Sequence, residues 1–262
     1  MSGQIKRVYP FIHLGPITLG TYGIMVASGL ICGFFIMRAD LARRGISADA
    51  ESIIGITGLS GLAGARLYHL LESPAEFFAN PWALLFSTMG FAWFGAVIGG
   101  FIALVVLARR FGMKMLLMLD VASPAAAIGY GIGRIGCLIS GDGDYGIPTS
   151  LPWGMSFPNG LVPTTERVHP TPIYEFLAAL VIALILWRIG RRAIAIEQPF
   201  GVVFGWYLIL TGIARFLVEF IRINPRSFFG MSNAQTASVV SVLAGALLLL
   251  ALQSRARSAR TA

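Results

Sequence analysis

The sequence has few charged residues, few histidines and only two cysteines. Charged side chains make up 12% of the 262 residues, about half the fraction found in a typical soluble domain. Both cysteines lie in apolar stretches and the three histidines are scattered, so the chain offers neither a disulfide framework nor the ligand spacing of a metal site. We therefore expect no metal and no cofactor, and the shortage of charge indicates a lipid environment.

Apolar residues are abundant, at 56% of the chain, and the mean hydropathy is +0.76. The net charge of +8 would suit a nucleic-acid partner, but the basic residues lie between long apolar runs and not on one amphipathic face. This pattern favours membrane lipids as partners and argues against nucleic acid.

The apolar residues gather in segments of membrane-spanning length, which is about 20 residues. No long polar block separates these segments, so we expect one integral domain over residues 1–262. The sequence predicts an all-α, polytopic membrane protein with about seven transmembrane helices, near 17–37, 53–71, 90–107, 121–140, 172–188, 200–218 and 235–252.

The N-terminal stretch does not resemble a secretory signal peptide. Pro10, His13 and Pro16 interrupt it, and no small-residue cleavage site follows a compact apolar core. We expect the first apolar segment to be retained as a membrane helix.

The distribution of basic residues predicts the orientation. Twelve lie on the side that holds the C-terminal tail, and five lie on the other side with the Pro- and Gly-rich loop 141–171. By the positive-inside rule, the C-terminus is cytoplasmic, whereas the N-terminus and this irregular surface loop are extracytoplasmic. The first set is Arg38, Arg43, Arg44, Arg109, Arg110, Lys114, Arg188, Arg191, Arg192, Arg255, Arg257 and Arg260, and the second is Lys6, Arg7, Arg167, Arg222 and Arg226.

Three further basic residues, Arg66, Arg134 and Arg215, fall inside or at the ends of predicted spans. A charge at the centre of a membrane helix costs about 2.5–3.5 kcal/mol on insertion scales, so such residues usually face a polar cavity or a partner. Together they indicate an anionic ligand. The alternative is a structural role, in which each arginine reaches a headgroup or pairs with a nearby acid.

The stretch GIGRIG, residues 131–136, matches the dinucleotide-binding pattern G-x-G-x-x-G. That interpretation requires a strand before the pattern and a helix after it in a soluble unit, whereas a membrane-helix sequence precedes it here. Gly133 and Gly136 instead allow a helix or a lipid headgroup to approach the backbone closely. The glycines recurring in GITGLSGLAGAR, residues 55–66, similarly predict a flat helix-packing face.

Two acids follow Arg134 in SGDGDYG, residues 140–146. A guanidinium group at the outer membrane surface suits a lipid phosphate, which it can bind bidentately. Asp142 and Asp144 could orient this arginine or transfer protons, or they could simply favour a turn, as Asp-Gly pairs do.

Two later motifs contain further candidates. In GIARFLVEFIR, residues 212–222, Arg215 and Glu219 are four residues apart and can pair on one helix face. VHPTPIYE, residues 168–175, places His169 and Tyr174 at the start of the fifth span. For His169 and for Tyr22 in the first span, a packed, solvated or aromatic-belt position is the alternative.

Taken together, GRIG with the acids after it, HPTPIYE, ARFLVEFIR, LDVASP and GARLYH resemble the prolipoprotein diacylglyceryl transferase family over residues 15–250. The resemblance implies a bacterial inner-membrane enzyme that needs no cofactor. Such an enzyme transfers a diacylglyceryl group from phosphatidylglycerol to the lipobox cysteine thiol of a prolipoprotein and releases glycerol phosphate.

The resemblance also implies roles for individual residues. Arg134 and Arg215 would bind the phosphate and stabilise the leaving anion, Glu219 would orient Arg215, and Asp142 would stand where the family has a glutamate. The full catalytic set is Arg134, Arg215, Glu219, Asp142 and His169, and the substrate-binding set is Arg134, Tyr22, Arg66, Gly133, Gly136 and Tyr174.

The sequence departs from the family pattern at several positions. Phe94 stands in the place of the histidine that is often assigned to proton transfer, and Ala96 replaces a glycine. Cys137 stands where the family has asparagine, and Thr211 where it has tyrosine. Because Phe94 cannot accept a proton, the base would be His169, Asp142, Glu219 or the lipid phosphate itself. Two alternatives remain: a same-fold relative with another acceptor or none, and an anionic-lipid-binding transporter, although we find no internal repeat of spans.

Overall fold

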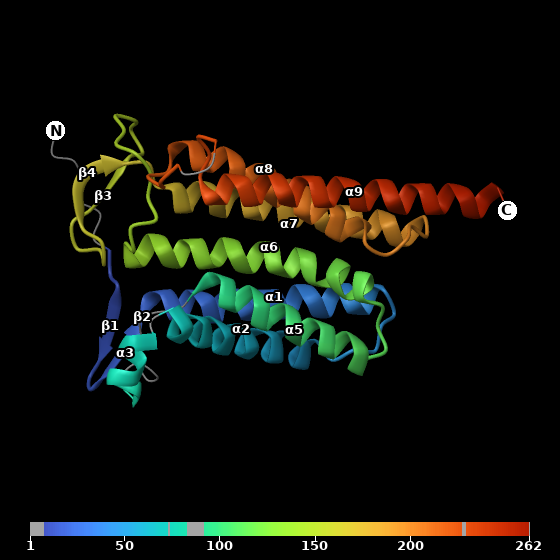
Figure 1. The fold of residues 1–262 in the computed structure, drawn as a ribbon, viewed down its shortest axis with the longest axis horizontal. Coiled ribbons are helices and arrows are strands. Elements are labelled where there is room, and N and C mark those ends of the chain that lie inside the picture. The colour runs from blue at the N-terminus through green and yellow to red at the C-terminus, as the bar shows by residue number, and fades with distance from the viewer. Residues whose placement is uncertain (1–7, 73, 83–91, 227–228, 262) are drawn as a thin grey trace. The chain divides into compact units, whose positions relative to one another are not determined.

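The computed structural model describes residues 8–72, 74–82, 92–226 and 229–261, and these are mainly helical, as predicted (Figure 1). The elements follow the order β1 (Phe11–Leu14), β2 (Ile17–Gly20), α1 (Thr21–Arg43), α2 (Ala50–Glu72), α3 (Pro74–Ala79), α5 (Trp93–Arg110), α6 (Met115–Ser140), β3 (Met155–Phe157), β4 (Thr164–Val168), α7 (Thr171–Ala195), α8 (Val202–Val218), the 3-10 helix η1 (Glu219–Ile221) and α9 (Asn233–Thr261).

The contacts group the chain into two compact units. The first comprises residues 1–37 and 119–262, and the second comprises residues 38–118. The single integral domain expected from the sequence stays a prediction.

Five helices are long and apolar enough to cross a membrane among the described residues. They are Thr21–Arg43, Met115–Ser140, Thr171–Ala195, Val202–Ile221 and Asn233–Ala256. This confirms a polytopic, all-α membrane protein. The predicted segments 53–71 and 90–107 correspond to α2 and α5, except that residues 90 and 91 lie outside the described residues. The count of seven spans stays a prediction.

The predicted start of the first span, at residue 17, is wrong. Residues 17–20 form strand β2, which pairs with β1 in an antiparallel hairpin in which Leu14 lies opposite Ile17. Pro16 cannot donate a backbone hydrogen bond, and Gly15 adopts a φ of 61° in the turn. Helix α1 therefore begins only at Thr21, whose hydroxyl donates to the carbonyl of Pro10 at 3.0 Å.

Several other helices extend beyond their predicted apolar cores. α6 begins at Met115 instead of residue 121, α7 continues to Ala195 and α9 continues to Thr261. Hydropathy identifies only the part of a helix that matches the hydrocarbon layer, whereas backbone hydrogen bonding continues through the polar turns on either side.

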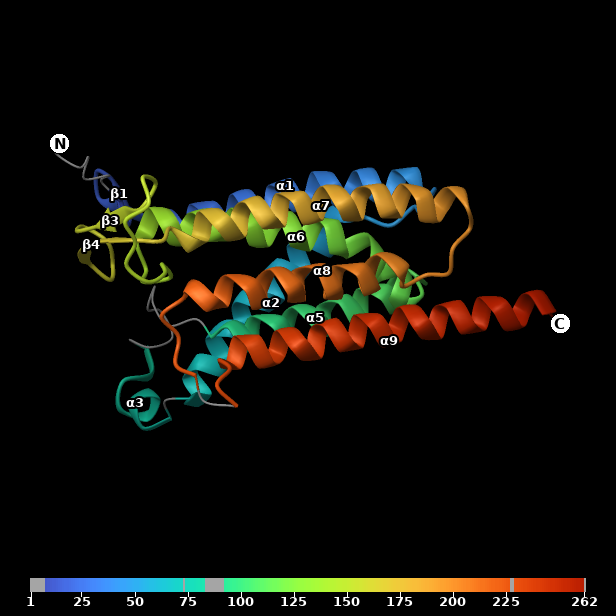
Figure 2. The same cartoon turned by 90° about the horizontal axis from the view of Figure 1, so that it is seen from above.

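In the first unit, α6, α7 and α8 pack around a core of small and aliphatic residues (Figures 1 and 2). Ala127, Ala183, Leu186 and Val203 are buried there. A Cβ atom added at Gly131 of α6 would lie 2.9 Å from the Cβ of Ala179 on α7. Without a strong hydrophobic force between helices in lipid, such close packing is what holds the spans together.

A buried carboxylate fixes the start of α8 against α6. Asp120 of α6 accepts hydrogen bonds from the backbone N–H groups of Gly201 at 2.7 Å and Phe204 at 2.8 Å. The first amides of a helix have no partner within the helix, so a carboxylate from another element can cap them. This cap fixes the position of the helix that carries Arg215.

The segment between α6 and α7 is more regular than the predicted loop. β3 and β4 form an antiparallel pair in which Met155 lies opposite Val168. The rings of Tyr145 and Phe157 stack with centroids 4.9 Å apart, and Val168 packs in the same buried cluster. The expectation of an irregular structure is therefore wrong for part of this segment, which has a small core of its own.

In the second unit, α2 and α5 pack through glycines, as the sequence predicts. A Cβ atom at Gly64 would collide with the carbonyl oxygen of Gly95, and one at Gly95 would collide with that of Gly64. In contrast, a Cβ atom at Gly55 would meet nothing within 4 Å. Only part of the glycine row therefore lies in the helix contact.

Candidate active site

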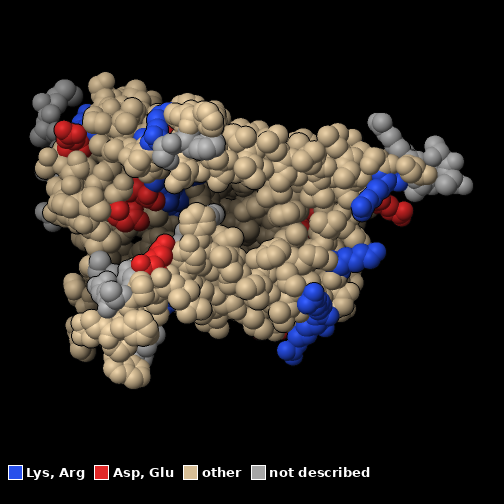
Figure 3. All heavy atoms as spheres, viewed as in Figure 1, with Lys and Arg blue, Asp and Glu red and all other residues tan. Residues whose placement is uncertain are grey.

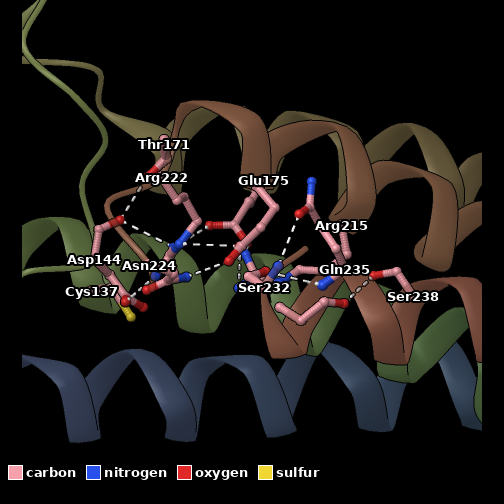
Figure 4. Close-up of polar contacts among 12 residues, drawn as sticks. Cys137, Asp144, Thr171, Glu175, Arg215, Arg222, Asn224, Ser232, Gln235 and Ser238 are labelled. Atoms are coloured by element: carbon pink, nitrogen blue, oxygen red, sulfur yellow. Dashed lines mark hydrogen bonds and ion pairs between the residues drawn. The ribbon is translucent and has the colours of Figure 1, made fainter. Parts of the chain in front are cut away.

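Three arginines from separate segments meet around one carboxylate in the first unit (Figure 4). Arg134 lies on α6, Arg215 lies in the last turn of α8, and Arg222 follows η1. A backbone bridge between Gly146 and Arg222 connects this region to the segment that precedes β3. The side chains of Arg134 and Arg222 are only 12% and 7% exposed.

Glu175, one turn into α7, is the carboxylate that these arginines share. Its Oε2 atom lies 2.7 Å from Nη2 of Arg134 and 3.3 Å from Nη1 of Arg222, and its Oε1 atom lies 3.1 Å from Nη1 of Arg215. The hydroxyl of Tyr130 also donates to Oε1 at 2.6 Å. Pro170 and Pro172 lie at the start of α7, and their restricted backbone fixes where the helix begins and thus where Glu175 lies.

Asp144 bridges two of the arginines from the opposite side. Its Oδ2 atom lies 2.5 Å from Nη1 of Arg134, and its Oδ1 atom accepts a short hydrogen bond from Nη2 of Arg222. The backbone carbonyl of Asp144 accepts from the hydroxyl of Thr171 at 2.6 Å. At 34% exposed, Asp144 is the most accessible acid of the cluster.

Glu219 holds the remaining side of Arg215. Its Oε2 atom lies 2.9 Å from Nη2 of Arg215 and 3.7 Å from Nε of Arg222. The side-chain amide of Asn224 donates to Oε1 at 2.6 Å. The pairing of Arg215 with Glu219 is the contact that their four-residue spacing predicts.

The three arginines and three acids make a formally neutral cluster. Buried charges are tolerated where they are paired and hydrogen-bonded, and this arrangement meets that condition except at the Nε atoms of Arg134 and Arg222. Nε of Arg222 lies 3.7 Å from Oε2 of Glu219 without a hydrogen bond. The Nε atom of Arg134 is buried and has no hydrogen-bond acceptor among the described residues. An unpaired N–H on a guanidinium group favours an anion that can accept from it.

Asp142 and Asp144 experience different electrostatic environments although they are two residues apart. Burial raises the pKa of the Asp142 carboxyl, and the charge of Asp144 raises it further. Burial also raises the pKa of Asp144, but Arg134 and Arg222 outweigh this effect and hold it below its usual value.

Cys137 completes the surroundings of the two aspartates. Its Sγ atom accepts a hydrogen bond from Nη1 of Arg134 at 3.5 Å, and Cys137, Asp142 and Asp144 offer ligand atoms within 4.8 Å of one another. Since two guanidinium groups already bind Asp144, this set does not suit a metal cation.

Known proteins are similar in sequence to this chain over most of its length. A sequence model of the prolipoprotein diacylglyceryl transferase family matches residues 10–251. The chain belongs to this family. Among curated relatives, a phosphatidylglycerol–prolipoprotein diacylglyceryl transferase of Clostridium tetani is 33% identical over 86% of this chain and 89% of its own length. The proteins of that name from Geobacter sulfurreducens and Nitrosospira multiformis are 34% and 32% identical over 87% and 91% of this chain, and over 87% and 84% of their own lengths.

The two glycines of GRIG, Gly133 and Gly136, differ in how closely other residues approach them. A Cβ atom at Gly136 would lie 3.1 Å from Cδ2 of Tyr22 and 3.1 Å from Cβ of Met25, so this glycine brings α6 close to α1. A Cβ atom at Gly133 would meet nothing within 4 Å. The phenol ring of Tyr22 therefore packs against the helix that carries Arg134.

His169 and Tyr174 belong to a separate polar group at the start of α7. Nδ1 of His169 lies 3.2 Å from the hydroxyl of Tyr174, to which Nε1 of Trp153 donates at 2.7 Å. In the described part of the chain, no hydrogen bond joins His169 or Tyr174 to the three arginines. Their roles in the transferase stay predictions.

Arg66 and Phe94 lie in the second unit, on α2 and α5. The ring of Phe94 is 6.4 Å from that of Tyr68, measured between centroids. The substrate-binding role expected for Arg66 stays a prediction.

Sequence reasoning missed two members of the cluster: Arg222 was assigned to the outer basic residues, and Glu175 was only a neighbour of Tyr174. Asp144 was considered as a residue that could orient Arg134, and it forms an ion pair with that arginine, but it was left out of the catalytic set. The signal that could have identified the two missed residues is their charge. Each lies near the end of an apolar segment, within a motif that was noted for a different residue.

Proposed function

We propose that this protein transfers a diacylglyceryl group from phosphatidylglycerol to the cysteine thiol of a prolipoprotein. The observation that carries the proposal is the convergence of Arg134, Arg215 and Arg222 at the end of apolar helices. The activity for which the relatives are named supports the same substrates.

The arginines bind the lipid phosphate and stabilise the leaving group. The sulfur of the acceptor forms a bond to the glyceryl carbon that bears the phosphate, and the C–O bond breaks with its electron pair on the phosphate oxygen. The phosphodiester carries one negative charge, whereas the departing glycerol phosphate carries nearly two. Donors aimed at this developing charge accelerate the step.

Asp142 takes the thiol proton in this proposal. It lacks an ion pair with an arginine in the described part of the chain, and its pKa is raised by burial, which makes its carboxylate a better base. Glu219 is less suited, because its side chain is 1% exposed and bound to Arg215.

The orientation follows from charge. Arg188, Arg191 and Arg192 lie in the last turns of α7, whereas the arginine cluster lies at its first turn. Figure 3 shows Lys and Arg side chains at helix ends away from the strands, and further ones, together with Asp and Glu, on the side of the strands. By the positive-inside rule, the cluster opens toward the outer leaflet of the bacterial inner membrane, and the C-terminus is cytoplasmic.

The test is a reconstituted assay with phosphatidylglycerol labelled in its acyl chains and a lipobox peptide. We expect label on the peptide cysteine, and a loss of at least 100-fold in kcat/KM for Arg134→Ala. Arg188→Ala, which removes an exposed arginine at the far end of α7, serves as the control. Full activity of Arg134→Ala would refute the proposed phosphate site. An unlabelled peptide in the presence of folded wild-type protein would refute the proposal that a prolipoprotein cysteine is the acceptor.

A further inference from the structure

The charge balance of the cluster leaves no room for a phosphate unless one acid gives up its partners. Three arginines already face three carboxylates. A phosphodiester entering this cluster would leave a buried excess of negative charge, which is costly where water is scarce. One carboxylate must therefore leave the arginines when the lipid headgroup binds.

Glu175 and Glu219 are poorly placed to leave. Their side chains are 4% and 1% exposed, and each has a further hydrogen bond, from Tyr130 and Asn224 respectively. Moving either carboxylate would leave several buried hydrogen-bond donors without an acceptor.

Asp144 is well placed to leave, because it is 34% exposed and its contacts with guanidinium groups come only from Arg134 and Arg222. Its two carboxylate oxygens each accept from a different guanidinium group, which is the geometry that two oxygens of a phosphate would adopt. Its backbone is held by Asp142 through its N–H and by Thr171 through its carbonyl. The carboxylate of Asp144 can therefore leave the two arginines by rotation of its side chain while its backbone stays in place.

We propose that Asp144 is a placeholder for the phosphate of the donor lipid. Its carboxylate neutralises Arg134 and Arg222 in the empty site, gives them up to the phosphate, and takes them back as glycerol phosphate leaves. This inference rests on the proposed function, since it requires that the arginines bind phosphate. It makes Asp144 a positioning residue that limits headgroup affinity and promotes product release.

The experiment measures binding of glycerol phosphate to the purified protein in detergent micelles by isothermal titration calorimetry. Asp144→Asn keeps the shape of the side chain but removes the competing charge. We therefore expect the dissociation constant for glycerol phosphate to be about tenfold lower in this variant, which corresponds to about 1.4 kcal/mol of binding free energy. Glu166→Gln is the matched control, because it removes one exposed carboxylate from the same segment between α6 and α7. Its dissociation constant should match that of the wild type.

Unfolding midpoints with and without ligand are recorded for the same proteins. Asp144→Asn should be less stable than the wild type when empty and recover when glycerol phosphate is added. Equal or weaker binding by Asp144→Asn, or no recovery of its stability with ligand, overturns the placeholder role of Asp144. If Arg134→Gln abolishes binding in that case, the proposed function still stands. If Arg134→Gln binds as the wild type does, both are overturned.

Discussion

Asp142 accepts a hydrogen bond from the backbone N–H of Asp144 at 3.2 Å, yet the pKa values of the two carboxyls shift in opposite directions. Asp142 makes no ion pair with an arginine among the described residues, whereas Asp144 is held between two arginines. The same residue type thus provides a candidate base and a counter-ion of two arginines, two residues apart.

We expect Asp142→Asn to raise the unfolding midpoint at pH 7 by a few degrees while lowering turnover. A carboxyl whose pKa is higher in the folded state loses stability as the pH rises from about 4, its unfolded value, through the folded pKa. The gain from Asp142→Asn should therefore vanish as the pH falls toward 4. Thermal unfolding in micelles between pH 4 and 8 measures this, and an unchanged or pH-independent midpoint would contradict it.

Asp144→Asn should show the opposite sign. The pKa of Asp144 is lowered in the folded state, so its stabilisation is complete above its unfolded value of about 4 and is lost as the pH falls through the folded pKa. The variant should therefore be less stable than the wild type throughout the range from pH 5 to 8. Matching midpoints in this range would show that the contacts with Arg134 and Arg222 contribute nothing.

Glu175→Gln should be the most damaging single change in the cluster, because three arginines lose a shared counter-charge. Removing one partner of a buried ion pair costs about 3–5 kcal/mol. We expect the free energy of unfolding to fall by about 3 kcal/mol, measured by titration of micelle-bound protein with a denaturing detergent. Tyr130→Phe is the comparison, since it removes only the hydroxyl that donates to Glu175 and should cost about 1 kcal/mol. Similar losses for both variants would argue against the shared role of Glu175.

Asp120→Ala should destabilise the protein by about 1–2 kcal/mol, because it uncaps α8 and leaves the amides of Gly201 and Phe204 without their acceptor. Hydrogen exchange at the start of α8 locates the loss. Asp120→Asn, which keeps an acceptor oxygen, should recover part of it. Unchanged protection of Gly201 and Phe204 in Asp120→Ala would contradict the cap.

Gly64→Ala should loosen the contact between α2 and α5, whereas Gly55→Ala on the same helix should not. A methyl group at Gly64 collides with the carbonyl oxygen of Gly95, and one at Gly55 meets open space. Alanine also favours a helix over glycine, so Gly55→Ala should leave the unfolding midpoint equal or slightly higher. Equal midpoints for both variants would remove the packing role of Gly64.

The sequence predicts those parts of the site that depend on local spacing. Arg134 is conspicuous because it lies inside an apolar run, and Arg215 with Glu219 follows from a separation of one helical turn. Fold class follows from the apolar runs in the same way. The hairpin at residues 11–20 was missed because its apolar residues also suit the start of a span.

The shared carboxylate could not be predicted, because its partners come from distant segments. Glu175 and Arg222 are separated by 47 positions in the chain, and Arg222 and Asp144 by 78. No local pattern specifies which acid meets which arginine across such separations. The packing of α6, α7 and α8 determines which acid meets which arginine, and this packing cannot be inferred from local patterns in a single sequence.

The distribution of the cluster over three helices also constrains the order of assembly during synthesis. Arg134 leaves the ribosome about forty residues before Glu175, and Arg215 and Arg222 follow later still. Asp144 follows Arg134 after only ten residues, but at about 5–20 residues per second the shared carboxylate of Glu175 arrives seconds later. Until α7 arrives, Asp144 is the only acid of the cluster that can pair with Arg134, so the synthesis of α7 completes the charge pairing of α6.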